Sequence, residues 1–324
     1  MKAIRAIFSQ FSGRYSRLGA ASIQLVLLVI LTAPLARGGL NAVVGNELCA
    51  AAETGDEKRV EAILKRGVAA DARNASGQTA LMRAAFRGQA NVVNLLLQNG
   101  ADPSAQSASD VGTHVLTWAV SGGKLQIISD LVAKGANMNV RARNGLSPLG
   151  AAVHENKPET VSFLIKQGAD VNMPGISYRS QDESDKRLIS PLASAAHSGC
   201  LEIVQSLVLG GSTLDLEDSR GDTPIMFAAR ARHPEVVTYL IERGATVNHT
   251  GKDGHTALIY AAYQGRMDIV QALLKAGADP ACVACDRVGD RITSKYTAAD
   301  VALQQHYPEI MALLRTEMFK RRNP

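Results

Sequence analysis

TALMRAAFRGQANVVNLLLQNGAD (residues 79–102) sets a pattern that three later stretches repeat: SPLGAAVHENKPETVSFLIKQGAD (147–170), TPIMFAARARHPEVVTYLIERGAT (223–246) and TALIYAAYQGRMDIVQALLKAGAD (256–279). In each stretch, Thr or Ser precedes Pro or Ala and an aliphatic residue, a pair of small residues follows, and an apolar segment ends at Gly. A hydroxyl side chain caps the start of a helix, and Gly ends one in a left-handed conformation. Each unit is therefore predicted to hold two short helices.

The pattern extends along most of the chain at a nearly constant period. The anchor position that opens each unit is occupied by Thr79, His114, Ser147, Ser190, Thr223, Thr256 and Thr297. These residues are 35, 33, 43, 33, 33 and 41 positions apart, and the closing glycines keep the same register. A period in this range indicates a repeat architecture.

The repeat resembles the ankyrin repeat, which has a period of about 33 residues and the signature Thr-Pro-Leu-His-x-Ala. The resemblance covers about residues 44 to 318. It implies an all-α ankyrin-repeat solenoid of about eight helix-turn-helix units with β-turn or hairpin tips. The apolar run further towards the N-terminus adds the expectation of a hydrophobic helix before the solenoid. The first and last units are atypical, as terminal caps are expected to be.

The signature His is the main departure from the family pattern. The positions that should carry it hold Met82, Thr117, Gly150, Ala193, Met226 and Ile259. We therefore expect the hydrogen bonding of that imidazole to be absent. Other features agree with the pattern: Pro158, Pro234 and Pro308 stand at the start of the second helix, where a missing N–H is tolerated.

Residues 1–38 form a separate segment that is cationic and then apolar. Leu18 to Ala36 is an almost unbroken apolar run, long enough to cross roughly 30 Å of hydrocarbon. It is interpreted as a cleaved signal peptide or as a retained single-span anchor, with a buried helix as a third alternative. Both leading interpretations place the repeats outside the cytoplasm, either periplasmic or secreted or attached to a membrane through residues 18–36.

The net charge of +5 comes from this segment alone. Residues 1–38 contain five basic residues and no acidic one, which leaves 30 basic residues (35 − 5) against 30 acidic ones. Nucleic-acid binding requires a surplus of cations, so a neutral body argues against it. The partner expected here is a protein, bound by a monomer.

The exposed positions of the first helix in each unit are the candidate binding positions, because ankyrin surfaces usually make contacts there. Two such positions, projected through the register, supply most of the candidate partner-binding residues: Phe86, Trp118, His154, His197, Arg230, Tyr260 and Tyr263. Aromatic residues and Arg carry much of the energy in protein interfaces. The alternative is that Trp118 and Tyr260, together with Phe227 at the same position, pack between repeats.

Two insertions break the 33-residue period. The insertion 174–189 is strongly charged and adds Tyr178, Arg179 and Arg187 to the candidate binding residues, although charged loops are often merely solvated. The insertion 281–296 carries Cys282 and Cys285 as a Cys-x-x-Cys pair. This pair is interpreted as a local disulfide, with free thiols or redox or metal chemistry as alternatives. A basic tail, 319–324, follows the last unit.

No enzyme motif stands out. The sequence contains no Gly-x-Ser-x-Gly elbow, no phosphate-binding P-loop and no Gly-x-Gly-x-x-Gly, so neither catalysis nor a cofactor is expected. The leading interpretation is an exported protein-binding scaffold, possible forms of which include an inhibitor or immunity-type protein. The alternatives are a redox or metal-handling accessory protein built on Cys282 and Cys285, and a secreted effector that binds host proteins.

Cleavage of the N-terminal segment can be tested by mass. We expect the purified mature chain to begin near residue 39 and to weigh clearly less than the 34.3 kDa of the full sequence. Intact-mass spectrometry makes the measurement. A mature chain that still begins at Met1 excludes cleavage and leaves the anchor interpretation.

Overall fold

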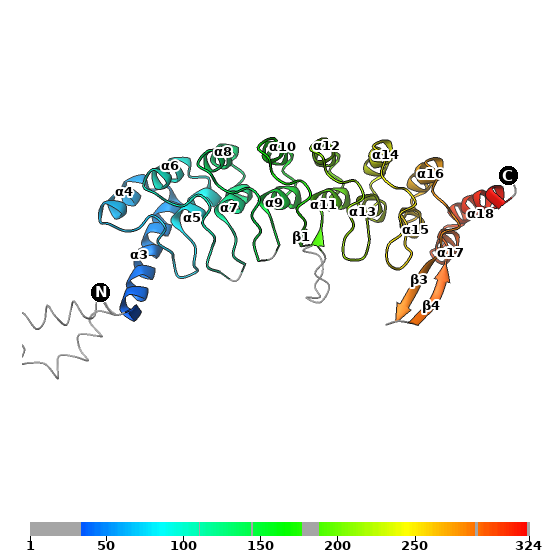
Figure 1. Cartoon of the computed structure of the whole chain (residues 1–324), viewed down its shortest axis with the longest axis horizontal. Helices are drawn as coiled ribbons and strands as arrows, with labels where there is room; N and C mark the ends of the chain where they lie inside the picture. The colour runs from blue at the N-terminus through cyan, green and yellow to red at the C-terminus, as the bar shows by residue number, and fades with distance from the viewer. Residues whose placement is uncertain (1–33, 110, 144, 177–187, 289–290, 323–324) are drawn as a thin grey trace, which may run out of the picture.

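The computed structural model describes residues 34–109, 111–143, 145–176, 188–288 and 291–322, with the backbone alone for 34–42, 176, 188, 286–288 and 291–293. Over these residues, sixteen helices form eight consecutive pairs, so the expected helix-turn-helix solenoid is confirmed. Figure 1 shows the pairs as one arched row, with the first helices and the connecting loops on its concave side. We call the first helix of each pair inner and the second outer.

The inner helices are short, apart from the first one. They are α3 (Pro34–Thr54), α5 (Ala80–Arg87), α7 (Val115–Gly122), α9 (Pro148–His154), α11 (Pro191–Ser198), α13 (Pro224–Ala231), α15 (Ala257–Tyr263) and α17 (Ala298–Gln304).

The outer helices are similar in length, apart from the last one. They are α4 (Glu57–Lys65), α6 (Ala90–Gln98), α8 (Leu125–Ala133), α10 (Pro158–Lys166), α12 (Leu201–Leu209), α14 (Pro234–Glu242), α16 (Met267–Lys275) and α18 (Pro308–Arg322).

The expected N-terminal hydrophobic helix over residues 18–36 lies almost wholly outside the described residues. Among the helices that are described, none combines the length and the apolar character needed to cross a membrane. The interpretation of residues 1–38 therefore stays a prediction.

Five of the seven anchor side chains cap the inner helices as the sequence predicts, whereas His114 and Thr223 accept no such hydrogen bond. The hydroxyl of Ser147 accepts a hydrogen bond from the N–H of Gly150 at 3.0 Å, and Ser190 does the same for Ala193. At the other end of each pair, the seven closing glycines have φ between 82° and 92°, which a side chain would strain. These glycines are Gly67, Gly100, Gly135, Gly168, Gly211, Gly244 and Gly277.

Methionine partly takes the place of the missing signature His. The sulfur of Met82 lies 3.5 Å from the N–H of Thr79, and the sulfur of Met226 lies at the same distance from the N–H of Thr223. Both methionines are almost fully buried. A weak sulfur acceptor therefore satisfies a backbone donor at the start of α5 and α13.

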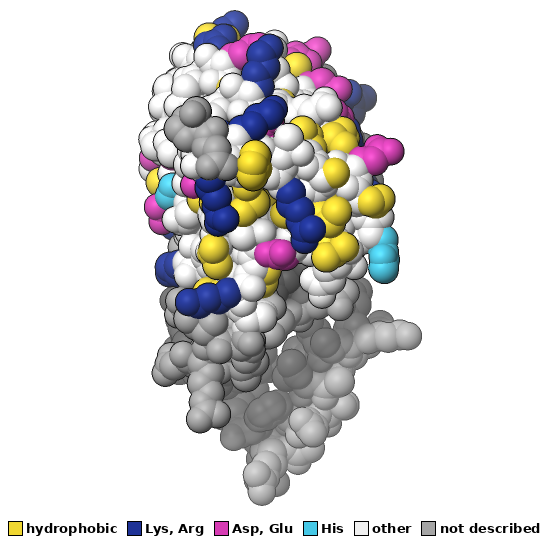
Figure 2. All heavy atoms as spheres, turned by 90° about the vertical axis from the view of Figure 1, so that its right-hand side faces the viewer, with side chains coloured by type: hydrophobic (Ala, Val, Ile, Leu, Met, Phe, Trp, Pro, Cys, Tyr) yellow, Lys and Arg dark blue, Asp and Glu magenta, His cyan; other side chains and the backbone are white. Residues whose placement is uncertain are grey.

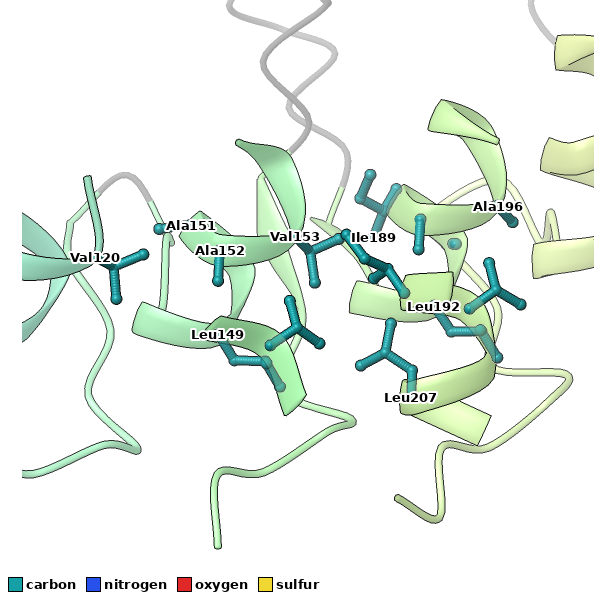
Figure 3. Packing of buried hydrophobic residues seen from close by; sticks show 14 of the residues in the cluster. Val120, Leu149, Ala151, Ala152, Val153, Ile189, Leu192, Ala196 and Leu207 are labelled. Carbon is teal, nitrogen blue, oxygen red and sulfur yellow. The ribbon is translucent and has the colours of Figure 1, made fainter. Parts of the chain in front are cut away.

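Small residues let neighbouring inner helices approach closely. The alanine pairs at 84–85, 151–152, 195–196, 228–229 and 261–262 are at most 1% exposed. In most units the inner helices contact the next unit more extensively than the outer helices do, which bends the row towards the inner side. The junction between α9 and α11 is the exception, because there α10 and α12 make the larger contact. Figure 3 shows this junction, with Ala151, Ala152 and Val153 on one side and Ile189 and Leu192 on the other.

A ladder of side-chain hydrogen bonds joins successive units. The residue four positions after each closing glycine accepts a hydrogen bond from the N–H two positions after the next closing glycine. For example, Asp71 accepts from the N–H of Asp102 at 3.1 Å, and Asn248 from that of Asp279 at 2.7 Å. The acceptors are Asp71, Ser104, Asn139, Asn172, Asp215 and Asn248.

Both insertions contain antiparallel hairpins. Strands β1 (Gly175–Ile176) and β2 (Leu188–Ile189) pair at the base of the insertion 174–189, and β3 (Ala284–Val288) pairs with β4 (Arg291–Tyr296) in the insertion 281–296. Helix α18 continues to Arg322 and so includes the described part of the basic tail, 319–324.

The last unit ends the row with a partly apolar surface. Leu303 stands where the units from α5 to α15 have a buried Ala or Val, and it is 53% exposed. Phe319 is 68% exposed near the end of α18. Seen from this end of the molecule, hydrophobic side chains lie between Lys and Arg side chains (Figure 2).

Two leucines on α12 test the packing. Leu207 is fully buried and Leu209 is 73% exposed, so the same change has different consequences two residues apart. We expect Leu207→Ala to lower the free energy of unfolding by about 2–5 kcal/mol, and Leu209→Ala by less than about 0.5 kcal/mol. Urea denaturation followed by circular dichroism measures both. Equal losses would contradict the packing described.

Candidate protein-binding surface

The side of the inner helices that faces the concave side of the row is the candidate surface, and we call it the inner face. It carries one position four residues after each anchor and another seven residues after it. On most inner helices, residues at these positions lie on either side of the buried small-residue pair, because a helix turns every 3.6 residues; on α9 the first of them, Ala151, is itself buried. The candidate residues on α5 to α15 therefore lie on one continuous surface, in the order in which their units occur.

An aromatic pair occupies the N-terminal part of the inner face. The rings of Phe86 on α5 and Trp118 on α7 meet edge to face, with centroids 5.4 Å apart. The guanidinium of Arg87 lies 5.7 Å from the centre of the Phe86 ring. Both rings are half-buried, and Trp118 also packs against the core. Within the described residues its indole N–H has no hydrogen-bond acceptor.

A carboxylate from the first unit holds two arginines beside this pair. Glu53 on α3 accepts hydrogen bonds from Arg83 at 3.2 Å and from Arg87 at 2.9 Å, each through the Nε atom. These hydrogen bonds, that from Arg83 first, lower the pKa of Glu53 below its ordinary value. The charges of the three side chains leave a surplus of one positive charge.

A second cluster lies on α13 and α15. The guanidinium of Arg230 lies 4.7 Å from the ring centre of Phe227 and 5.5 Å from that of Tyr260. Its Nη1 atom is 3.4 Å from a carboxylate oxygen of Asp222, and the hydroxyl of Tyr260 donates to the same carboxylate at 3.1 Å. The side chain of Asp222 is only 4% exposed, whereas that of Arg230 is 28% exposed. The contacts with Asp222 and the two rings thus fix the guanidinium of Arg230, while part of this side chain stays exposed to solvent.

Histidines and a further tyrosine extend this cluster. His197 on α11 meets Phe227 edge to face at 6.3 Å. On the other side, His255 stacks on Tyr260 at 5.2 Å and its Nε2 lies 3.1 Å from the hydroxyl of Tyr296 on β4. The cluster therefore joins four consecutive units.

The remaining candidates differ in their surroundings. His154 on α9 and Tyr263 on α15 are exposed, Tyr263 by 53%, and so are open to a partner. Phe227 is only 4% exposed, so it packs between units. Tyr178, Arg179 and Arg187 lie outside the described residues, and their part in binding stays a prediction.

Asp222, His255 and Tyr296 are the members of the cluster that sequence reasoning missed. All three directly precede an anchor residue, at Thr223, Thr256 and Thr297. Other units have Gln78, Thr113, Leu146 or Ile189 at this position. An acidic residue next to a helix-capping Thr could have drawn attention to Asp222, but nothing in the sequence links it to Arg230 or Tyr260.

The cysteines are free thiols in this structure. The disulfide between Cys282 and Cys285 is therefore not formed here, and it stays a prediction for an oxidising compartment. Burial and the nearby Asp279 raise the pKa of Cys282. Burial also raises the pKa of Cys49 to about 11, so that thiol is unreactive near neutral pH. In the described part of the chain, no group of three or more His, Cys, Asp or Glu side chains could hold a metal ion.

A sequence profile described as "Ankyrin repeats (3 copies)" matches residues 43–107, 105–175 and 192–284. These matches cover more than half of the chain. The chain belongs to the ankyrin-repeat family. The helical pairs, the anchor positions and the closing glycines are the family's features, and the resemblance seen in the sequence is confirmed.

Several curated ankyrin proteins are similar over part of the repeat region. A putative ankyrin repeat protein of Rickettsia felis is 32% identical over 130 residues, which are 39% of this chain and 42% of that protein. The ankyrin repeat and KH domain-containing protein mask-1 of Caenorhabditis elegans is 32% identical over 149 residues, 46% of this chain and 5% of that protein. The E3 ubiquitin-protein ligase KEG of Arabidopsis thaliana is 34% identical over 40% of this chain and 8% of its own length. The match thus spans less than half of each of these relatives.

The fold also matches a solved structure. The human ASB11 ankyrin repeat domain superposes with a TM-score of 0.59 at 24% identity, over 73% of this chain and 98% of that domain. At this identity the match shows the fold alone. Ankyrin arrays are protein-interaction scaffolds, and the repeat region here is of that kind.

The Glu53 cluster makes stability depend on pH. Because the folded pKa of Glu53 is below its ordinary value of 4.5, its stabilising contribution is fully present above pH 4.5 and is lost as the pH falls through the folded pKa. We expect Glu53→Gln to lower the free energy of unfolding at pH 7, and expect this difference from the wild type to shrink below pH 4.5. Urea denaturation at pH 7 and pH 3.5 measures it.

Glu61→Gln serves as the control, because Glu61 and its partner Lys65 are both largely exposed on α4 and such pairs contribute little. A Glu53→Gln difference that stays constant between the two pH values would contradict the assignment.

Proposed function

We propose that this protein is an exported scaffold that binds one partner protein along its inner face, with the insertion 174–189 adding contacts. The observation that carries the proposal is the inner face itself. On α5, α7, α13 and α15 it presents half-buried aromatic rings and arginines that are already held in place by neighbouring side chains. Side chains that are ordered before binding favour affinity, because the conformational entropy lost when flexible side chains become ordered opposes association.

Export is supported by the sequence of residues 1–38. A cationic start followed by the apolar run from 18 to 36 is typical of segments that direct a chain to or across a membrane. The proposed location is therefore periplasmic or secreted, or membrane-anchored with the repeats outside the cytoplasm. The protein acts there as a monomer.

A specific form of this function is the masking of another exported protein, as an inhibitor or immunity-type protein does. The arched row in Figure 1 offers a concave surface, which can cover a convex rim of a partner. A secreted effector that binds host proteins would use the same surface. The two differ in the source of the partner and not in the way the surface binds it.

Affinity capture tests the proposed function. Full-length protein serves as bait in a detergent extract of the exported compartment, beside a second bait that carries Phe86→Ala and Tyr263→Ala. We expect the wild-type bait to retain one protein. The variant bait should lose this protein or bind it with a dissociation constant more than tenfold higher. Loss of two interface aromatic residues commonly weakens binding by that much or more.

The matched control is a bait with Leu209→Ala, which removes an exposed hydrophobic side chain from outer helix α12. It should retain the partner as the wild type does. Retention of the partner by all three baits would show that the inner face is not the binding surface. A third variant, with Cys282→Ser and Cys285→Ser, should also retain it. If only this cysteine variant loses the partner, the redox or metal-handling alternative is favoured.

A further inference from the structure

Six of the eight inner helices share a charge bias that residues 39–324 as a whole do not have. The six inner helices α5, α7, α9, α11, α13 and α15 contain no Asp and no Glu. Their ionisable cationic side chains are Arg83, Arg87, His154, His197 and Arg230. Acidic residues do occur in the outer helices, such as Glu159 on α10 and Asp268 on α16. Because residues 39–324 are neutral as a whole, this separation is not a consequence of net charge.

The carboxylates nearest to the inner face are already paired or buried. Glu53 binds Arg83 and Arg87, and Asp300 accepts the hydrogen bond of the Thr297 N–H at the start of α17. In the loops, Asp218 and Asp222 are buried, whereas Glu217 is 54% exposed and lies 3.4 Å from Nε2 of His249. Among the described residues, a ligand crossing the inner helices would therefore meet few unpaired negative charges.

Arg230 is the best placed cation on this surface. Two aromatic rings and the buried carboxylate of Asp222 fix its guanidinium. Within the described residues its hydrogen bonding to that carboxylate uses Nη1 only, whereas a guanidinium has five N–H groups in a planar fork. The donors that remain match the two oxygens of a carboxylate. Exposed Tyr263, on the next inner helix, adds a hydroxyl and an aromatic ring.

We propose that the partner presents an acidic segment to the inner face, with one of its carboxylates bound by Arg230 and its apolar side chains against the aromatic rings. This inference rests on the proposed function and adds the chemistry of the partner. A protein segment fits better than a nucleic acid, because the six inner helices contain no Lys and only three Arg. Binding to a phosphate backbone depends on many cations along its path.

Peptide selection tests the charge of the ligand. A phage library of random twelve-residue peptides is selected on immobilised full-length protein, with counter-selection on the Tyr263→Glu variant. We expect the retained peptides to be net negative. The most enriched one, made synthetically, should bind Tyr263→Glu at least tenfold more weakly than Tyr263→Gln. These two variants remove the same ring and differ only in charge, at a side chain whose exposure makes unfolding a minor concern.

Two matched pairs of variants locate the effect. Leu209→Glu puts the same charge on an exposed position of an outer helix and should leave the affinity for the peptide unchanged. Arg230→Gln should weaken binding roughly tenfold, because a charge-assisted hydrogen bond is lost. Arg243→Gln is the matched control and should not weaken binding. Arg243 also stacks on a tyrosine ring, that of Tyr239 at 4.8 Å, but it lies at the end of outer helix α14.

Three results would overturn the inference. Retained peptides that are neutral or basic would leave the protein-binding function intact and refute the acidic partner. The acidic partner would also be refuted if the selection yielded no peptide whose binding is weakened by Tyr263→Glu. In that case, affinity capture of a partner would still decide the proposed function by itself. Tighter binding of a thirty-nucleotide thymidine strand than of the selected peptide, lost in Arg230→Gln, would assign the surface to nucleic acid instead.

Discussion

Close contact between inner helices is the constraint on which the rest of the structure depends. Two helices can approach closely only where their facing side chains are small, and the alanine pairs meet that condition in five of the units. Since the outer helices carry larger side chains and stay further apart at most junctions, the row bends towards its inner side. The small alanine side chains therefore produce the concave surface. They also align the side chains on it, which are Phe86, Trp118, Phe227, Arg230 and Tyr260.

The side-chain hydrogen bonds between units then fix the position of each unit along its neighbour, which the apolar contacts alone do not determine. Packed alanines tolerate sliding, because dispersion forces have little direction. The acceptors four residues after each closing glycine remove that freedom, since each reaches one particular N–H of the next unit, as Asp215 does for Thr246 at 3.0 Å. Every unit is thereby placed by its neighbours alone, as in other repeat arrays.

The sequence predicted most of the fold and only part of the surface. Period, caps and closing glycines are local signals, so the helical pairs can be placed from the order of the residues alone. The ring contacts of Trp118 and Tyr260 were one of two alternatives that the sequence left open. The Asp222–Arg230–Tyr260 cluster was not predicted, because Asp222 lies in a loop with no regular spacing to Arg230, and Tyr260 joins the two only through the stacking of the next unit. The reversed contact at the α9–α11 junction also follows from the stacking and has no signal in the spacing.

The ladder between units has an evolutionary consequence. Each of its bonds joins positions that keep the same offset from successive closing glycines, so duplication or loss of one whole unit leaves a matching donor and acceptor on both sides of the change. The gene can therefore lengthen or shorten the array in steps of one repeat without a compensating mutation. A step between α7 and α13 would change the distance between the Phe86–Trp118 pair and the Arg230 cluster. The same two contact groups could then bind a partner of a different size.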